Sequence, residues 1–469
     1  MFKLSPTKFF VYCALIFGII LITLIPPFQS PDEDSHFKRA YVISQGHLYP
    51  SSQNGIVGYF VPNDMSAYIS EKQTFIGNRD RKYTYSEEIL DDRLPKDYSD
   101  RSFQNFSTAE TTPIAYLAPA SGIVFAKISE RLTGIEKISV TYMLHFARFF
   151  SLILYVVIVG LAIKITPILK KTFCLIGLIP MSLYLAVAIS YDSVLIAVSM
   201  LATALIFKLK FDENIKKVSW WHIIALGIMG YILLKVKTVY ITLLIPLIFI
   251  PREKYGKNKK EIIKVIAMIL GIIVGLFIIN KIPSLTLQRA AADNSASSEQ
   301  LQLIIHHPIS YLKMSLRIMW ENRNFYYSGM FGMFGLIDTY LPTVYMFMYM
   351  IAFVGIIIAD LSLCEKKFNW KYKTVAILGC IASVFGVFTA MYVYWTSMEK
   401  GVGADTITGV QGRYFLPIIP LGMIIFSNSI LAKKSIIKKL LNTILENSYL
   451  ISFIMLAVSS ITILLRYWC

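Results

Sequence analysis

Long uninterrupted apolar runs are the feature that most limits how this chain can fold. A helix needs roughly 20 mostly apolar residues to cross about 30 Å of hydrocarbon, because each residue rises about 1.5 Å. Eleven segments meet or nearly meet this requirement: Phe9–Pro26, Val140–Ile163, Phe173–Ile189, Val194–Phe207, Trp220–Leu234, Val239–Ile250, Ile263–Ile279, Thr343–Leu363, Val375–Trp395, Tyr414–Leu431 and Leu450–Leu465. With 55% hydrophobic residues the chain is too apolar for a soluble domain. The sequence therefore predicts an all-α polytopic membrane protein with about 11 transmembrane helices.

The positions of the basic residues predict the orientation of these spans. The net charge of +17 is compatible with nucleic-acid binding, but the bias of Lys and Arg toward cytoplasmic loops explains it better. Lys3 and Lys8 place the N-terminus in the cytoplasm. The later short basic clusters then all fall on the same side, at 164–171, 208–217, 252–264, 366–373 and 433–439. We therefore expect an external C-terminus, and we expect no nucleic-acid partner.

The spans divide the chain into five parts. These are a first span (1–28), a large external segment with interfacial helices (29–139), a transmembrane bundle (140–280), a second external segment (281–341) and a C-terminal bundle (342–469) with a short external loop (396–412). The first span resembles a signal peptide, but Pro26 and Pro27 leave no small-residue cleavage site. The apolar stretch Pro113–Lys127 is short, so we expect it to lie at the membrane interface.

A cluster of ionisable residues follows the first span directly. Asp32, Glu33, Asp34 and His36 lie at the outer membrane surface, where charged groups are costly unless they have a function. A carboxylate here can take a proton from an attacking hydroxyl as a general base. Alternatively, Asp32 and Asp34 can bind a hard divalent cation. A third interpretation is that Asp32 or Asp34 only caps the helix that begins near Ser35.

Arg148 lies inside an apolar span, about two turns from its outer end. At that depth an arginine needs an anion or a water-filled cleft, and a lipid phosphate fits this need. The alternatives are that Arg148 extends to the headgroups or pairs with a carboxylate such as Asp192. Asp192 itself lies at an external helix junction, where it is equally suited to be an N-cap.

Two further external turns carry candidate ligand-binding residues. Lys237 and Tyr240 occupy a tight turn between two spans, although Lys and Tyr also serve there as interfacial anchors. Gln411, Arg413 and Tyr414 enter a later span, and the planar fork of arginine suits phosphate oxygens. The sequence has no nucleotide-binding glycine motif, so we expect no nucleotide-driven chemistry.

Three motifs carry a family resemblance. Pro26-Pro27-Phe28-Gln29 runs into PDEDSHF, FGLIDTYLP covers 334–342 with Asp338, and GVQGRYFLP covers 409–417. Together they resemble the bacterial membrane family called domain of unknown function 2142, which is similar to the GT-C glycosyltransferases. The resemblance implies a plasma-membrane enzyme with Asp32 as base, Glu33 as its partner and Arg148 on the donor phosphate. Family members often read PDEP, and Asp34 replaces that proline here.

The resemblance implies the transfer of one sugar from a polyprenyl-phosphate donor to a cell-envelope glycan or lipid-linked acceptor, with inversion at the anomeric carbon. His36, Asp192, Lys237, Asp338 and Arg413 are then expected near the substrates, together with Tyr240, Gln411 and Tyr414. A rival function is a transporter or flippase of lipid-linked glycans, which requires polar residues through the whole membrane. A third is a non-catalytic partner in envelope polysaccharide assembly.

Overall fold

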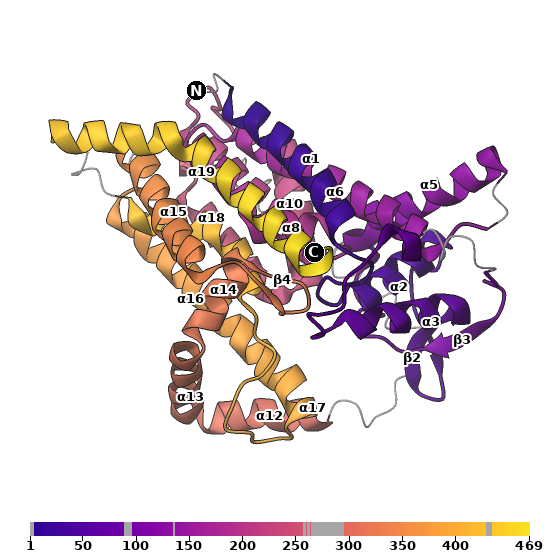
Figure 1. Cartoon of the computed structure of the whole chain (residues 1–469). Helices are drawn as coiled ribbons and strands as arrows, with labels where there is room; N and C mark the ends of the chain where they lie inside the picture. The colour runs from indigo at the N-terminus through magenta and orange to yellow at the C-terminus, as the bar shows by residue number, and fades with distance from the viewer. Residues whose placement is uncertain are drawn as a thin grey trace.

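A computed structural model describes residues 4–88, 96–134, 137–256, 259, 263, 295–366, 368–427 and 434–469. Its first helix, α1 (Pro6–Leu24), and its last, α19 (Ser435–Tyr467), run parallel (Figure 1). The ring of Phe9, near the start of α1, stacks at 4.1 Å on that of Tyr449, near the middle of α19. Near the ends of both helices, the Trp468 indole donates to the Leu24 carbonyl at 2.8 Å. The two chain termini therefore lie at opposite ends of the helix bundle.

Among the described residues, six helical segments are long and apolar enough to cross a membrane. They are α1, α6 (Val140–Ile165), α9 (Tyr191–Phe211), α15 (Thr343–Leu363), α19 and the continuous run Trp370–Glu399, which contains α16 (Trp370–Ala390), a π-helical turn (η6, Met391–Thr396) and α17 (Ser397–Glu399). Helices α7 (Lys170–Gly177) and α8 (Pro180–Val187) count as a seventh if they form one span bent by 55°. The bend occurs at Pro180, which cannot donate the hydrogen bond that would continue α7.

Three shorter apolar helices occupy predicted spans. They are α10 (Trp220–Val236), η3 (Thr238–Phe249) and the segment Gly412–Phe426, made of η7 (Gly412–Ile418), α18 (Ile419–Gly422) and η8 (Met423–Phe426). Pro246 and Pro417 interrupt the last two, which keeps them short. The predicted span Ile263–Ile279 lies outside the described residues, Ile263 excepted. The described residues therefore contain six or seven candidate spans, and the full count of eleven stays a prediction.

Three of the predicted basic clusters meet at one end of the bundle. Lys254 donates to the Asp212 carbonyl at 2.9 Å, and Lys366 pairs with Glu213 at 2.6 Å. Lys210 donates to the Phe249 carbonyl at 3.2 Å. The predicted grouping of 208–217, 252–254 and 366–373 on one side is therefore confirmed, while the assignment of that side to the cytoplasm stays a prediction.

A small α/β domain occupies the opposite end, called here the domain side. It contains α2 (Glu33–Ser44), the antiparallel strands β1 (Ser51–Gln53), β2 (Ile56–Pro62) and β3 (Arg101–Gln104), α3 (Asn63–Lys72), and a short turn η1 (Gln73–Phe75). An external domain with interfacial helices was predicted here, and the structure adds a three-stranded sheet to it. Strands this short have few alternating residues, and the apolar run of α1 dominates the pattern beside them.

The stretch predicted to lie at the interface forms η2 (Pro113–Tyr116) and α5 (Leu117–Thr133). Helix α5 packs along α2 and α6, and it is not among the helices long and apolar enough to cross a membrane. Its outer face exposes Leu117, Phe125 and Leu132. These positions suit an interfacial helix, as predicted.

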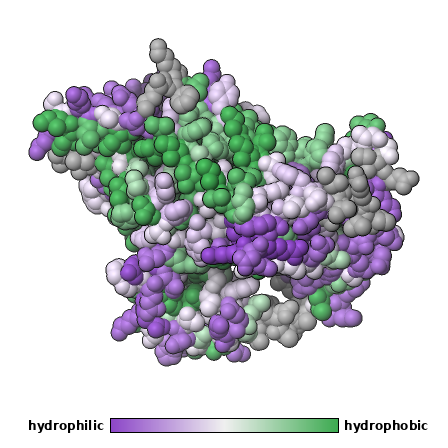
Figure 2. All heavy atoms as spheres, in the orientation of Figure 1, coloured by the Kyte–Doolittle hydropathy of each residue, from purple (hydrophilic) through white to green (hydrophobic). Residues whose placement is uncertain are grey.

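A second polar lobe lies beside the domain side. It contains α12 (Ser295–His306), α13 (Pro308–Glu321) and α17, below the helix bundle at the lower left of Figure 1. Figure 2 shows this lobe as mainly hydrophilic, below the hydrophobic band of the bundle. Helix α14 (Arg323–Phe331) and the hairpin β4–β5 (Met333–Phe334, Thr339–Tyr340) connect it to α15.

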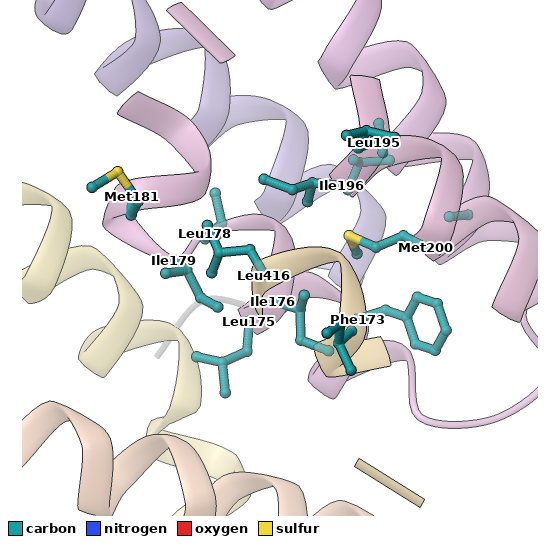
Figure 3. Packing of buried hydrophobic residues seen from close by; sticks show 14 of the residues in the cluster. Phe173, Leu175, Ile176, Leu178, Ile179, Met181, Leu195, Ile196, Met200 and Leu416 are labelled. Atoms are coloured by element: carbon teal, nitrogen blue, oxygen red, sulfur yellow. The ribbon is translucent and has the colours of Figure 1, made fainter. Parts of the chain in front are cut away.

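The centre of the bundle is a packed apolar core. Phe173, Ile176 and Ile179 from α7 and the turn after it lie beside Met200 of α9 and Leu416 of η7, all nearly or fully buried (Figure 3). The core lies among α1, α6, α7, α8 and α9. Packing in this core fixes the positions of the helix ends that carry the candidate site.

Candidate functional site

Asp32 immediately precedes helix α2. Its backbone is left-handed (φ 58°), its carbonyl accepts from the His36 amide at 3.1 Å, and its side chain makes no capping hydrogen bond. The carboxylate is 57% exposed and accepts from Nη2 of Arg413 at 2.7 Å. The interpretation of Asp32 as a simple helix cap is therefore wrong, because its charge faces a partner 381 residues away.

Arg413 enters the site from η7. A close backbone contact fixes this segment: a Cβ atom at Gly412 would clash with the Tyr326 carbonyl of α14, so only glycine fits. The Arg413 side chain is only 4% exposed, and its Nε lies 3.2 Å from Oδ2 of Asp192. Its Nη1 has no hydrogen-bond partner among the described residues. A buried guanidinium N–H without a partner is costly, and an anionic ligand would satisfy it.

Asp192 and Lys237 complete the charged group. Ser190, not Asp192, caps α9, because its hydroxyl accepts from the Asp192 amide at 3.0 Å. This leaves the Asp192 carboxylate free to pair with Nζ of Lys237 at 3.3 Å as well as with Arg413. The ammonium lies 3.6 Å from the Tyr414 ring centroid, a cation–π contact. Asp32, Asp192, Lys237 and Arg413 are called the four-charge cluster below.

Lys237 stays charged within this cluster. Burial alone would lower the pKa of its ammonium, but the Asp192 carboxylate outweighs burial and raises the pKa above the ordinary value. Two carboxylates therefore face two permanent cations. Such a neutral cluster can accept an anion at its cations while one carboxylate stays exposed.

His36 lies behind the cluster on α2. Its Nδ1 is 2.7 Å from the Tyr116 hydroxyl, and its ring meets the Tyr191 ring edge-on at 4.7 Å. Burial lowers the pKa of His36 to about 4, although the carboxylates of Asp32 and Asp192 act in the opposite direction. The imidazole is therefore neutral at pH 7, and it positions α2 rather than binding phosphate as a cation.

The neutral His36 predicts a loss of stability in acid. The folded-state pKa of about 4 lies below the ordinary 6.5, so the unfolded chain takes up the proton first as the pH falls. The stabilising contribution is present above pH 6.5 and is lost toward pH 4; it amounts to about 3 kcal/mol. Thermal unfolding in detergent at pH 7 and pH 4.5 measures this loss. The His36→Asn variant does not titrate and should lose less, and an equal loss in both proteins would contradict the assignment.

Glu33 and Arg148 form a closed pair beneath the cluster. Both side chains are 0% exposed. Oε1 of Glu33 accepts from Nε of Arg148 at 2.8 Å, and Oε2 accepts from Nη2 at 2.6 Å. Nη1 and Nη2 also donate to the carbonyls of Ile25 and Pro26 at 2.6 Å and 3.1 Å. These bonds leave no side of the Arg148 guanidinium open to a donor phosphate, and Glu33 is buried away from solvent. The predicted roles of Arg148 as the phosphate contact and of Glu33 as the partner of the base are therefore corrected: the two residues form a structural ion pair.

The other predicted residues of these turns act through the backbone. The Tyr240 hydroxyl is buried and donates to the Tyr414 carbonyl at 2.6 Å. The Gln411 carbonyl accepts from the Tyr414 amide at 3.1 Å. Tyr240 and Gln411 therefore help to position the Arg413 segment, and their role as ligand contacts stays a prediction. Tyr414 contacts the four-charge cluster through its ring, over which the Lys237 ammonium lies.

Asp338 lies in a different polar group. In the hairpin β4–β5, its Oδ2 accepts from Nη2 of Arg466 at 2.9 Å, and its carbonyl accepts from Arg79 at 3.2 Å. It joins the end of α19 to the loop after η1. The Asp338 carboxylate therefore pairs with Arg466 and not with a member of the four-charge cluster, and its role as a substrate contact stays a prediction.

Asp34 was the second candidate metal ligand. It is half-buried in the first turn of α2, with Oδ2 3.4 Å from the Ser35 hydroxyl. Over the described ranges of the chain, no group of three or more His, Cys, Asp and Glu side chains could hold a metal ion. A divalent cation on Asp32 and Asp34 therefore stays a prediction.

Sequence reasoning missed Tyr116 and Tyr191 as parts of the site. Tyr191 precedes Asp192 and faces both His36 and Lys237, the latter at 5.0 Å from its ring centroid. The only feature of the sequence that could have identified Tyr191 was its position next to Asp192. Tyr116 lies in a stretch read as interfacial, and nothing in its local pattern indicates contact with His36.

Comparison with known proteins gives one match. A family model described as "Predicted membrane protein (DUF2142)" matches residues 15–422. This range includes the PDEDSHF and GVQGRYFLP segments that supply Asp32 and Arg413. No curated protein and no solved structure matches the chain.

Proposed function

This chain belongs to the DUF2142 family of predicted membrane proteins, and we propose that it is a membrane glycosyltransferase. It moves one sugar from a polyprenyl phosphate on the outer face to a hydroxyl of a cell-envelope glycan or lipid-linked acceptor. The observation that carries the proposal is the four-charge cluster. An exposed carboxylate, Asp32, directly contacts a buried arginine, Arg413, that has an N–H group to spare.

The proposed chemistry uses Asp32 as the general base. The acceptor hydroxyl oxygen attacks the anomeric carbon, and its proton passes to the Asp32 carboxylate. The bond from the anomeric carbon to the phosphate oxygen breaks at the same time. The polyprenyl phosphate leaves with the electron pair, and the sugar is inverted. Asp32 suits this role because it is the exposed carboxylate of the cluster.

Arg413 and Lys237 stabilise the leaving phosphate in this proposal. The family resemblance favoured Arg148, but its N–H groups are taken by Glu33 and two carbonyls. Arg413 offers a free Nη1, and Lys237 adds a second positive charge through the shared Asp192. When the donor binds, Arg413 exchanges its contact with Asp32 for phosphate oxygens, which frees the base. Fixed cations of this kind supply a large share of catalysis at charged transition states.

The packed core argues against the rival transporter function. A flippase needs polar residues from the domain side to the opposite side. Beneath the cluster, Leu416 follows Arg413 by one turn and packs among Ile176, Ile179 and Met200 (Figure 3). In the described part of the core the buried hydroxyls of Ser199 and Thr203 bond to the backbone of their own helix. This dry layer favours chemistry at one surface over transport.

Reconstitution tests the proposed function directly. The purified full-length chain in liposomes is incubated with polyprenyl-phosphate sugars and an envelope glycan fraction from cells that lack the protein. We expect mass spectrometry to show glycan enlarged by one sugar, and nucleotide sugars alone to give none. If the envelope glycans of cells with and without the protein are identical, and no donor is consumed in liposomes, the proposal is wrong.

Arg413→Lys tests the contact with the leaving phosphate. Lysine keeps the charge but loses the planar fork that reaches Asp32, Asp192 and an anion together. Loss of one charged hydrogen bond should reduce the transfer rate by roughly 10- to 100-fold. The measurement is the initial rate in the liposome assay. The matched control is Arg252→Lys, which exchanges an exposed arginine at the opposite end of the bundle and should keep the wild-type rate; an equal fall in both variants would contradict the role of Arg413.

A further inference from the structure

The polar lobe contains a cavity of about 440 Å³ between α12, α13 and the loop after α17. Its lining residues include Tyr311, Tyr392, His307, Ser310, Arg317 and Asp405. This volume is within the range of about 300–1,000 Å³ that small-molecule sites occupy. None of these residues belongs to the four-charge cluster.

Two tyrosines add aromatic surface to this cavity, which Leu303, Ile304 and Met314 also line. The rings of Tyr311 and Tyr392 lie 5.6 Å apart with an interplanar angle of 35°. Both hydroxyls are held: Tyr392 donates to the Ala404 carbonyl at 2.9 Å, and the Tyr311 hydroxyl lies 2.8 Å from that of Thr389. The rings are therefore fixed in place. Tyr311, the less buried of the two, presents rigid aromatic surface to a ligand at low entropic cost, and the buried Tyr392 supports it.

Polar groups of both kinds surround the tyrosines. Arg317 donates to the Asp405 carbonyl at 2.6 Å, which ties the loop to α13 and leaves further N–H donors on its exposed guanidinium. Ser310 and His307 add donor and acceptor atoms, and the Asp405 carboxylate adds acceptors. Arg317 and Asp405 carry opposite charges, so the cavity favours a neutral ligand over an anion.

We propose that this cavity binds a pyranose unit of the acceptor glycan. A sugar ring has an apolar C–H face for the tyrosines and hydroxyl groups at its edge that both donate and accept hydrogen bonds. The lobe lies outside the hydrophobic band of Figure 2, where a glycan is accessible and lipid tails are not. The role as acceptor site rests on the proposed function; binding of a glycan does not.

The chain connects this cavity to the charged cluster. Asp405 lies eight residues before Arg413. Helix α13 continues into α14, whose Tyr326 and Gly329 touch the backbone of Gly412. A glycan held in the cavity therefore contacts the same two segments that place Arg413. Extension of that glycan along the loop would bring its terminal hydroxyl toward Asp32.

Filling the cavity tests the inference. Ser310→Trp places an indole in it, and Lys313→Trp adds the same residue at an exposed position of α13 outside the lining. The probes are fluorescent tetrasaccharides of β-linked glucose, N-acetylglucosamine or galactose, and fluorescence polarisation with the full-length protein in detergent measures binding. We expect at least one probe to bind wild type and Lys313→Trp equally, and Ser310→Trp to bind it at least tenfold more weakly.

Two results would overturn the inference. One is that no probe binds, or that Ser310→Trp binds as tightly as wild type. The other is that brominated phospholipids in liposomes quench the introduced indole of Ser310→Trp, which would make the occupant a lipid. Asp32→Asn separates this inference from the proposed function. If the probe binds this variant and wild type equally but neither transfers sugar, the transferase proposal fails and the glycan site stands.

Discussion

Replacing Arg148 with alanine is expected to lower the free energy of unfolding by about 3–5 kcal/mol, because it leaves the Glu33 carboxylate buried without its counter-charge. Glu33 would retain one hydrogen bond, from the Ile189 amide at 3.2 Å. The carbonyls of Ile25 and Pro26 would also lose their donors at the end of α1. Equilibrium unfolding in detergent or bicelles, with membrane abundance as a second measure, shows the loss.

Two matched variants define what this result means. Lys366→Ala breaks an ion pair whose side chains are 42% and 82% exposed, and it should change stability by less than about 1 kcal/mol. The double variant Glu33→Leu with Arg148→Met removes both charges and should recover much of the lost stability. If Arg148→Ala instead folds as well as wild type and loses only sugar transfer, Arg148 is a ligand contact after all.

The Glu33–Arg148 pair also shows where prediction from sequence stopped. The apolar span around Arg148 indicated an anion or a water-filled cleft, and a lipid phosphate, the headgroups and a carboxylate such as Asp192 were the predicted partners; Glu33 was not among them. The choice depends on the left-handed backbone of Asp32, since the two neighbouring carboxylates then face opposite ways. Asp32 points to Arg413 and Glu33 points into the bundle. A local sequence pattern does not encode that reversal.

The four-charge cluster was predictable as a set of residues but not as a set of contacts. Its members were candidates because a charged residue at the end of a span is costly unless it has a function. They are Asp32, Asp192, Lys237 and Arg413. Their pairing depends on how α2, α9, α10 and η7 meet, which is a property of the packed core. The apolar segments of the sequence likewise predicted where the spans lie. Prolines interrupt several of these segments, so the resulting helices are shorter than a membrane span.

Asp32→Asn is expected to reduce the rate of sugar transfer by roughly 10²–10⁴-fold, the usual contribution of a general base. The amide is nearly the same size but takes no proton from the acceptor hydroxyl. Because the Asp32 side chain is 57% exposed, the variant should reach the membrane at the wild-type level. Rates in the liposome assay are compared at equal protein amounts.

Asp34→Asn is the matched control, because it removes a neighbouring carboxylate that has no contact with Arg413 in the described structure. It should transfer sugar at the wild-type rate. If both variants are equally slow, a general loss of negative charge around α2, such as a lost cation, explains the effect better than a base does. Full activity of Asp32→Asn would mean that the contact between Asp32 and Arg413 is only structural. The exposed end of the cluster would then bind substrate without taking part in proton transfer.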